Sequence, residues 1–201
     1  MIINRGGEMP PLKKFQREDI VEAACQIAKD EGFQEVNARR IARHLHCSVQ
    51  PIYHNFSTMD ELKRVVTERI RQTYIQYMKS GADEELAYRG MGLSYIRFAR
   101  DYPNYFKLLF MTESRLSPNR FIRNDAAGND ILRIGQKFSG LSNEEMEQFH
   151  LKVWLFTHGI AVMAATKTVA FSDGEIEELL SVTVKEMLIG FRAVHKQEEP
   201  V

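Results

Sequence analysis

Apolar residues recur at intervals of three and four positions along most of this chain, and such spacing predicts amphipathic α-helices. The first helix is expected over residues 17–31, because Gly32 follows at a position where glycine commonly ends a helix. Thr58 and Glu61 have the spacing of a capping box and predict another helix, which continues to about Lys79. The rest of the chain is also helical in pattern, so we expect an all-α fold.

Two short segments between these helices have the spacing of a helix-turn-helix. Ile41 and Leu45 lie one helical turn apart, and a turn of four residues follows. Ile52 and Phe56 then repeat the same inward spacing. A helix-turn-helix places its second short helix in the major groove of DNA.

Capping residues mark the ends of both short helices. Asn37 is the expected N-cap of a helix over residues 38–45, and Ser48 is the expected N-cap of a helix over residues 49–55. Pro51 falls in the first turn of the second helix, where its missing N–H would have had no partner inside the helix.

The C-terminal part predicts further helices and a division into two domains. Residues 112–120 read as a loop, and residues before Met9 and after His195 read as frayed ends. We expect a three-helix head over residues 9–57 and a helical body over residues 58–201. The body helices are expected over residues 86–100, 103–111, 125–137, 142–170 and 172–195.

Charge supports DNA binding locally rather than globally. The 201 residues carry a formal net charge of zero, so the chain as a whole has no attraction to nucleic acid. Between Val36 and Thr58, however, there is no carboxylate among several arginines and histidines, and a phosphate backbone favours such a surface. The alternative is a solvated basic helix face, which is the expectation for Arg40 and Arg43. The arginines and histidines of this window are Arg39, Arg40, Arg43, His44, His46 and His54.

The stretch from Val153 to Val169 is apolar on nearly all sides of its predicted helix. A membrane span is disfavoured, because His158, Gly159 and Lys167 interrupt the stretch and it is shorter than the roughly 20 residues that a span needs. A second copy of the chain is the simplest cover for such a helix, so we expect a homodimer and no membrane.

Other chemistry has little support in the sequence. Cys25 and Cys47 lack a CxxC spacing and read as small buried apolar residues. No metal is expected at His44, His46 and Cys47, because a zinc site needs about four ligands at ordered spacing. No cofactor is expected either. The N-terminus lacks a secretory segment, which makes the cytoplasm the expected compartment.

The chain resembles the TetR (tetracycline-repressor-like) family of transcriptional regulators over residues 17–68. The similarity further on is to the Trp-His-Gly type of C-terminal domain, through Trp154, His158, Gly159 and the Tyr102-Pro103-Asn104-Tyr105-Phe106 segment. The positions that carry the N-terminal resemblance are Gly32-Phe33, Asn37, Ile41-Ala42, Ser48, Tyr53, Phe56 and Leu62.

The resemblance implies a homodimer that binds a palindromic operator in double-stranded DNA and releases it when an effector binds the body. This chain departs from the family at the turn glycine, which is His46, and at the lysine that opens the fourth helix, which is Met59. Histidine tolerates a positive φ better than most residues, and Lys63 lies one turn after the missing lysine. The resemblance makes Tyr53 a phosphate contact. The predicted DNA-binding residues are Asn37, Arg39, Ser48, Val49, Gln50, Pro51, Tyr53, His54 and Lys63.

An apolar effector pocket is expected in the body, although most of its candidate residues could equally fill the core. Methionine is adaptable and suits a permissive pocket. The effector's identity cannot be read from the sequence. The candidate ligand-binding residues are Phe106, Phe110, Met111, Phe149, Trp154, His158 and Met163.

These features predict a ligand-responsive DNA-binding regulator, most simply a repressor. The alternative is a helix-turn-helix protein controlled by a protein partner, without a small-molecule site. An enzyme is not expected, because the chain has no Gly-rich phosphate loop, no nucleophile elbow and no HExxH motif.

Overall fold

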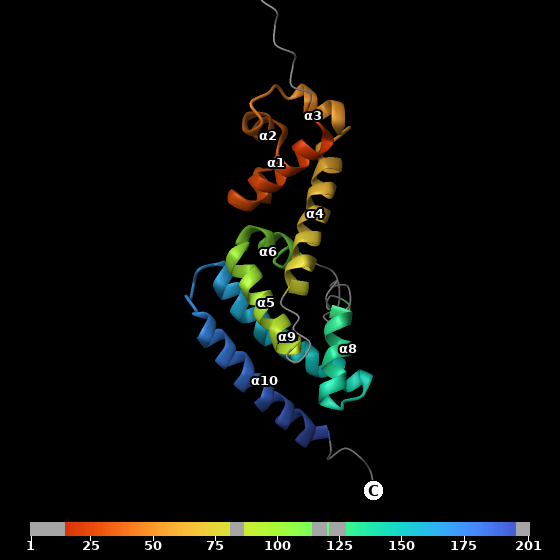
Figure 1. Ribbon diagram of the computed structural model, residues 1–201, viewed down its shortest axis with the longest axis vertical. Coiled ribbons are helices and arrows are strands. Elements are labelled where there is room, and N and C mark those ends of the chain that lie inside the picture. The colour runs from red at the N-terminus through yellow and green to blue at the C-terminus, as the bar shows by residue number, and fades with distance from the viewer. Residues whose placement is uncertain (1–14, 81–86, 114–119, 121–127, 196–201) are drawn as a thin grey trace, which may run out of the picture.

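The computed structural model describes residues 15–80, 87–113, 120 and 128–195, and these residues form helices and turns without a strand (Figure 1). The expected frayed ends and most of the expected 112–120 loop lie outside the described residues. The head comprises α1 (Arg17–Asp30), the 3-10 turn η1 (Phe33–Glu35), α2 (Ala38–His44) and α3 (Gln50–Asn55), and α4 (Met59–Ser80) follows. The body comprises α5 (Ala87–Asp101), α6 (Pro103–Phe110), α8 (Gly128–Ser139), α9 (Asn143–Ala165) and α10 (Asp173–His195).

Helix α1 forms where its apolar stripe predicts it. Ile20, Ala24, Ile27 and Ala28 are all buried against the other head helices. Gly32 follows the C-cap with a φ of +104°, a conformation that favours glycine. Phe33 begins the 3-10 turn η1, and its side chain packs half-buried against the edge of the core.

Helix α4 joins the head to the body. Its inward residues Leu62, Val66, Ile70 and Tyr74 are at most 2% exposed, and one continuous hydrophobic cluster runs from α1 along α4 into α5 and α6. The Thr58 hydroxyl accepts a hydrogen bond from the Glu61 N–H at 3.1 Å, as the capping box predicts. Figure 1 shows α4 passing from the top of the molecule into the body.

A second connection runs from α6 to α1. The Tyr105 hydroxyl donates to the Cys25 carbonyl at 2.9 Å, and the Asn104 amide donates to the Lys29 carbonyl at 2.8 Å. Cys25 and Cys47 are half-buried rather than fully buried, and neither forms a disulfide. Burial raises the pKa of the Cys25 thiol to about 11.

The two C-terminal helices have the expected starts, but α9 ends five residues early. Ser142 and Glu145 form a complete capping box at its start. At its end Lys167 adopts a φ of +57°, and the Thr168 N–H bonds the Met163 carbonyl at 3.0 Å. This left-handed ending is usually made by glycine, so a lysine there gave no signal in the sequence.

A second, smaller hydrophobic cluster lies where α9 meets α10. Its buried members are Leu141, Met146, Phe149, Val153 and Phe191. The Phe149 and Phe191 rings meet edge to face at 5.6 Å between centroids. This cluster holds the C-terminal end of α10 against the start of α9.

His150, next to Phe149, should make stability depend on pH. Its side chain is buried, and burial lowers its pKa to about 4. A histidine in the unfolded chain titrates near 6.5, so between these values the unfolded state binds the extra proton and the free energy of unfolding falls as the pH falls. This residue alone should cost about 2 kcal/mol between pH 7 and pH 5, measured by urea unfolding.

The His150→Gln variant should lose that part of the pH dependence. The matched His44→Gln variant changes an exposed histidine and should keep it. Burial also lowers the pKa of His158, so this second histidine adds a pH dependence of stability of the same sign in the wild type and in both variants. The same pH dependence in His150→Gln as in the wild type would contradict this assignment.

Candidate DNA interface

Helices α2 and α3 lie at the end of the head farthest from α10 (Figure 1). The Asn37 side chain caps α2 by accepting from the Arg40 N–H at 3.1 Å. At the other end of α2, His46 has a φ of +53°, and the Cys47 N–H bonds the Ala42 carbonyl at 2.9 Å. Histidine therefore adopts the left-handed conformation of the turn glycine, and the chain reverses into α3.

The expectation that Ser48 caps α3 is wrong. Val49 is the N-cap, with no side-chain hydrogen bond, and its carbonyl accepts from the Ile52 N–H at 3.1 Å. The reason is Pro51: if Ser48 were the N-cap, Pro51 would be the third helical residue, and it has no N–H for the serine to accept. The exposed Ser48 hydroxyl is left available for other contacts.

Helix α3 separates into a buried and an exposed face. Ile52 and Phe56 are 0% and 2% exposed and fix the helix to the head core. Val49, Gln50, Tyr53 and His54 are exposed, and Tyr53 retains 54% of its accessible surface. A single helix therefore offers a row of side chains of the types that read base edges and phosphates.

Arg17 holds the far end of α3 in place, a role that sequence reasoning missed. Its guanidinium donates to the Asn55 carbonyl at 2.7 Å and to the Glu61 carboxylate at 3.0 Å, and it lies 4.0 Å from the Phe56 ring centroid. The Asn55 amide donates in turn to the Pro51 carbonyl at 2.8 Å. One arginine therefore links α1, the last turn of α3 and the first turn of α4.

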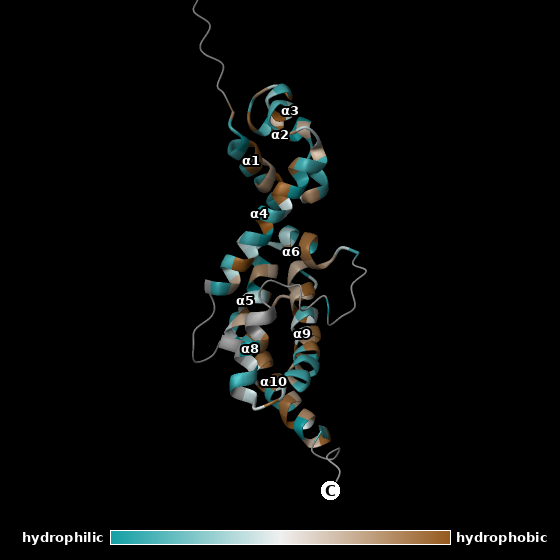
Figure 2. Cartoon of the chain, turned by 90° about the vertical axis from the view of Figure 1, so that its right-hand side faces the viewer, coloured by the Kyte–Doolittle hydropathy of each residue, from teal (hydrophilic) through white to brown (hydrophobic). Residues whose placement is uncertain are grey.

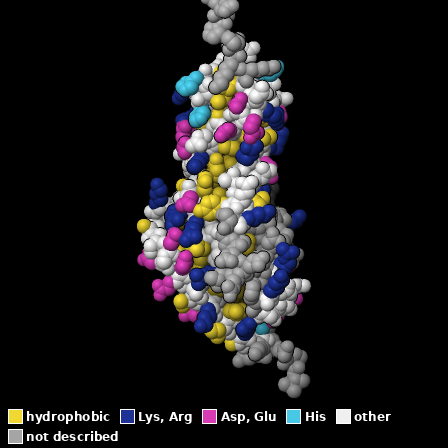
Figure 3. All heavy atoms as spheres, in the orientation of Figure 1, with side chains coloured by type: hydrophobic (Ala, Val, Ile, Leu, Met, Phe, Trp, Pro, Cys, Tyr) yellow, Lys and Arg dark blue, Asp and Glu magenta, His cyan; other side chains and the backbone are white. Residues whose placement is uncertain are grey.

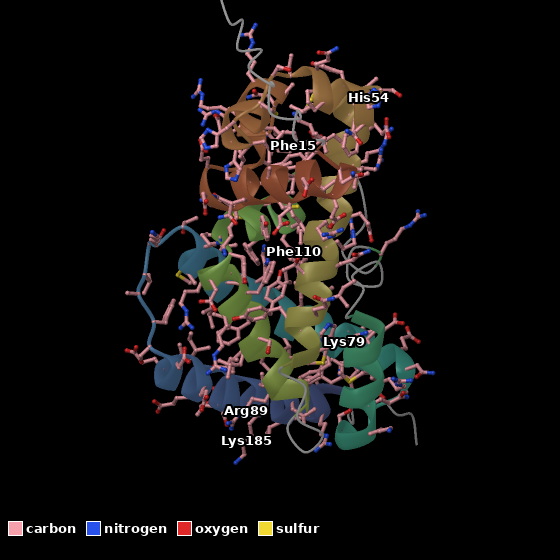
Figure 4. The ribbon with its side chains drawn as sticks, turned by 45° about the horizontal axis from the view of Figure 1, so that its top comes forward. Phe15, His54, Lys79, Arg89, Phe110 and Lys185 are labelled. Atoms are coloured by element: carbon pink, nitrogen blue, oxygen red, sulfur yellow. The ribbon has the colours of Figure 1, made fainter. Side chains whose placement is uncertain are left out.

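The surface beside α3 is basic. Arg40 is paired with Glu31 and Glu35, which agrees with its expected role as a surface residue. Arg39 and Arg43 are exposed, and no carboxylate among the described residues lies within ion-pair distance of either. Figure 3 shows histidine side chains, with lysine and arginine beside them, toward the head end of the molecule, and Figure 4 places His54 there.

The remaining predicted DNA-binding residues differ in how accessible their side chains are. The Asn37 side chain is engaged on both sides, because its amide also donates to the Glu35 carbonyl at 3.0 Å. Pro51 is half-buried. Lys63 is half-buried on α4, with its ammonium 5.7 Å from the Phe33 ring centroid. The Asn37 side chain therefore supports DNA binding by holding the start of α2, whereas the Ser48 and Arg39 side chains are exposed and can contact DNA directly.

Comparison with known proteins identifies this arrangement. Residues 20–65 match the family described as bacterial regulatory proteins, tetR family. This part of the chain is therefore a DNA-binding domain of the tetR-family type. A TetR-like transcriptional regulator from Rhodococcus sp. RHA1 has the same fold, with a TM-score of 0.61 and 15% sequence identity, over 86% of this chain and 95% of that one.

A curated protein also matches part of this chain. It is the nucleoid occlusion factor SlmA of Haemophilus ducreyi, which is 25% identical over 111 residues, or 49% of this chain. The match spans 55% of that protein, so the chain covers about half the length of this relative.

The family match over residues 20–65 and the helices of the described residues confirm the helix-turn-helix and all-α predictions. TetR proteins are DNA-binding transcriptional regulators rather than enzymes, which agrees with the expectation from the sequence. Among the described residues, none of the helices combines the length and apolar character needed to cross a membrane.

Four of the seven predicted ligand-binding residues form one aromatic group in the body. The Trp154 and His158 rings stack at 4.7 Å, Phe106 lies 5.6 Å from His158, and Phe110 lies 5.2 Å from Phe106. The Tyr95 hydroxyl is 3.0 Å from Nδ1 of His158. Burial lowers the pKa of His158 and so favours the neutral imidazole, which has one donor and one acceptor nitrogen.

The other three predicted ligand-binding residues lie elsewhere or at the edge. Phe149 belongs to the second cluster with Phe191, so it does not share a site with Phe106. Met111 follows α6 and is 43% exposed, and Met163 is half-buried near the end of α9. Spacing along the chain grouped these residues, but different helix faces separate them.

Replacing Arg17 with alanine should weaken binding to every DNA sequence alike. The variant loses the hydrogen bond that holds the end of α3, while the exposed face of α3 keeps all its side chains. We expect a roughly five- to tenfold loss of affinity, typical for one hydrogen bond to a charged group that is partly exposed. The change is measured by fluorescence anisotropy with a labelled duplex.

Arg71→Ala is the matched control, because Arg71 has the same 47% side-chain exposure and pairs only with Glu68 in its own helix among the ion pairs of the described chain. It should leave DNA affinity nearly unchanged. Equal losses in both variants would show that Arg17 acts only through charge.

Proposed function

We propose that this chain is a homodimeric transcriptional repressor of the cytoplasm that binds a palindromic operator and is released by a small apolar effector. The observation that carries the DNA-reading part is the exposed row on α3, namely Val49, Gln50, Tyr53 and His54, held by a buried opposite face. We assign base contacts to Gln50, Val49 and Pro51, and phosphate contacts to Tyr53, Ser48 and Arg39.

The dimer is supported by uncovered apolar side chains on the C-terminal helices. Leu155 of α9 is 56% exposed, and Val182 and Ile189 of α10 are 49% and 60% exposed. Figure 2 shows hydrophobic residues continuing along α9 and α10 to the lower end of the molecule. A second copy packed against this face would cover them, and two-fold symmetry would then impose a palindromic operator.

Control by a ligand is supported by the path from the aromatic group to α4. The Phe110 ring, in contact with Phe106, also meets the Tyr74 ring of α4 at 5.0 Å between centroids. A ligand that displaced these rings would push on the helix that carries the head. A coupling of about 1–3 kcal/mol would change DNA affinity roughly 5- to 150-fold. We therefore place the domain boundary just before α4, at residue 58, with α4 as the lever.

Control by a protein partner is the second candidate. One described cavity in the body has a volume of about 250 Å³, slightly below the roughly 300–1,000 Å³ usual for ligand sites. A regulator without a small-molecule site would instead bind its protein partner on an exposed surface.

Crosslinking the two heads of a DNA-bound dimer separates these possibilities. We expect that an effector found by screening apolar compounds for thermal stabilisation still binds the crosslinked dimer but no longer releases DNA. Release from the crosslinked dimer would contradict head separation as the mechanism. If no compound of a broad apolar panel stabilised the protein, control by a protein partner would be the better account.

A further inference from the structure

A cavity of about 250 Å³ lies between α5, α9 and α10, apart from the aromatic group around His158. Its inner wall is apolar. The residues of this wall include Gly92, Val153, Leu180, Val184 and Leu188. The one buried polar side chain in it, Thr157, donates its hydroxyl to the Val153 carbonyl at 2.8 Å and is thereby satisfied within its own helix.

Two cationic residues line the same cavity. Arg89 comes from the start of α5 and Lys185 from the middle of α10, and Figure 4 shows them close together at the end of the body away from the head. Arg89 lies 3.7 Å from the Glu177 carboxylate, which also lies 3.9 Å from Arg97. Lys185 has no carboxylate within ion-pair distance in the described part of the chain. Arg97 is held more closely by Asp173, at 2.7 Å, so Glu177 is the partner of Arg89, and Lys185 has no carboxylate partner among the described ion pairs.

Gly92 keeps the cavity open. It lies inside α5, where glycine destabilises a helix by about 1 kcal/mol relative to alanine, and its backbone is not in the left-handed region that would require glycine. A Cβ at this position would lie 3.5 Å from Cδ1 of Leu180 and 3.9 Å from Cγ2 of Thr157, which is ordinary contact distance. Alanine would therefore fit, and a side chain here would occupy the cavity.

We propose that this cavity binds a small anionic amphiphile, with its apolar chain against Gly92 and Leu180 and its carboxylate between Arg89 and Lys185. This site is separate from the aromatic group around His158. It adds a ligand class, the apolar carboxylates, and it rests on the proposed function only for its effect on DNA binding. The apolar wall supplies affinity through burial, and the two cations supply charge complementarity for the head group.

Calorimetric titration of the full chain with saturated straight-chain carboxylates tests this assignment. The probes run from hexanoate to dodecanoate, below their micelle concentrations, with primary alcohols of the same length as neutral controls. We expect affinity to rise about fourfold per methylene until the cavity is full and then to level off. Carboxylates should bind at least roughly tenfold more tightly than the alcohols.

Two variants locate the site. Lys185→Gln should reduce carboxylate affinity toward that of the alcohols and leave alcohol affinity unchanged, whereas Lys107→Gln, at an exposed position of α6, should change neither.

Gly92→Leu should abolish binding of both the carboxylates and the alcohols. If Gly92→Leu fails to fold, Gly92→Ala should raise thermal stability while the affinity plateau moves to a chain shorter by about one methylene. Gly174→Ala is its control, because a Cβ there meets nothing within 4 Å.

Equal binding of carboxylates and alcohols, or unchanged carboxylate binding in Lys185→Gln, would overturn the proposal. Absence of binding together with a loss of the dimer in Gly92→Leu would show that the cavity receives a side chain of a second copy instead. DNA binding tests the proposed function separately. Carboxylates that bind without changing DNA affinity would leave the site standing but count against ligand control. If a neutral compound releases DNA while carboxylates do not bind, ligand control stands and the proposed carboxylate site is wrong.

Discussion

Replacing Ile189 with aspartate is expected to split the proposed homodimer and to weaken operator binding by roughly 10²- to 10⁴-fold. Ile189 is 60% exposed on α10, the most exposed of the large apolar side chains among the described residues. In the proposed interface an aspartate would lose its hydration against the apolar side chains of the second copy, which strongly opposes association. Each monomer would then bind its half-site alone, without the effective concentration that the second head provides.

Sedimentation velocity at micromolar concentration gives the assembly state, and anisotropy with an operator duplex gives the affinity. Met111→Asp is the matched control, because it places the same charge on a 43% exposed apolar residue beyond α6. It should remain a dimer. A wild-type protein that sediments as a folded monomer, or an Ile189→Asp variant that stays dimeric, would count decisively against the α9–α10 interface.

Replacing Gln50 with alanine should relax base preference at one or two positions of each half-site. Gln50 is exposed on α3, and a glutamine amide can form two hydrogen bonds with an adenine edge in the major groove. Such a pair contributes about 1–3 kcal/mol of discrimination, so the preferred base should lose roughly 5- to 150-fold of its advantage. Competition among duplexes that differ at single base pairs measures this directly.

Lys63→Ala provides the contrasting result. Lys63 lies on α4 outside the row on α3, so its proposed contact is with phosphate. Its loss should weaken all sequences alike and lower the slope of log affinity against log salt by about one unit. A change in base preference in Lys63→Ala would contradict the phosphate contact proposed for α4. An unchanged base preference in Gln50→Ala would contradict the base contact proposed for α3.

The parts of the fold that follow local rules could be predicted from the sequence. The start of α1, the Asn37 cap, the positive φ at His46 and the capping boxes that open α9 and α10 all depend on residues within a few positions of one another. The errors occurred where one local rule cancelled another. Pro51 removed the donor that Ser48 would have capped, and Lys167 made the left-handed ending that normally marks a glycine.

The candidate sites were harder to predict, because they depend on which helix faces meet. Arg17 reaches Asn55 and Glu61, which lie 38 and 44 positions away in sequence, and no periodic pattern records such a contact. Phe149 and Phe106 have the same chemistry but face different clusters. The cavity lined by Arg89 and Lys185 could not be predicted, because both residues look like ordinary surface charges until α5 and α10 are packed together.

Selection from a random pool of duplexes will show whether the exposed face of α3 reads DNA sequence from a two-fold dimer. Full-length protein should enrich a motif of two inverted half-sites, and the Gln50→Ala variant should enrich the same spacing with a relaxed base at one or two positions of each half. A pool that yields no motif, or a motif unchanged by the substitution, would contradict the account.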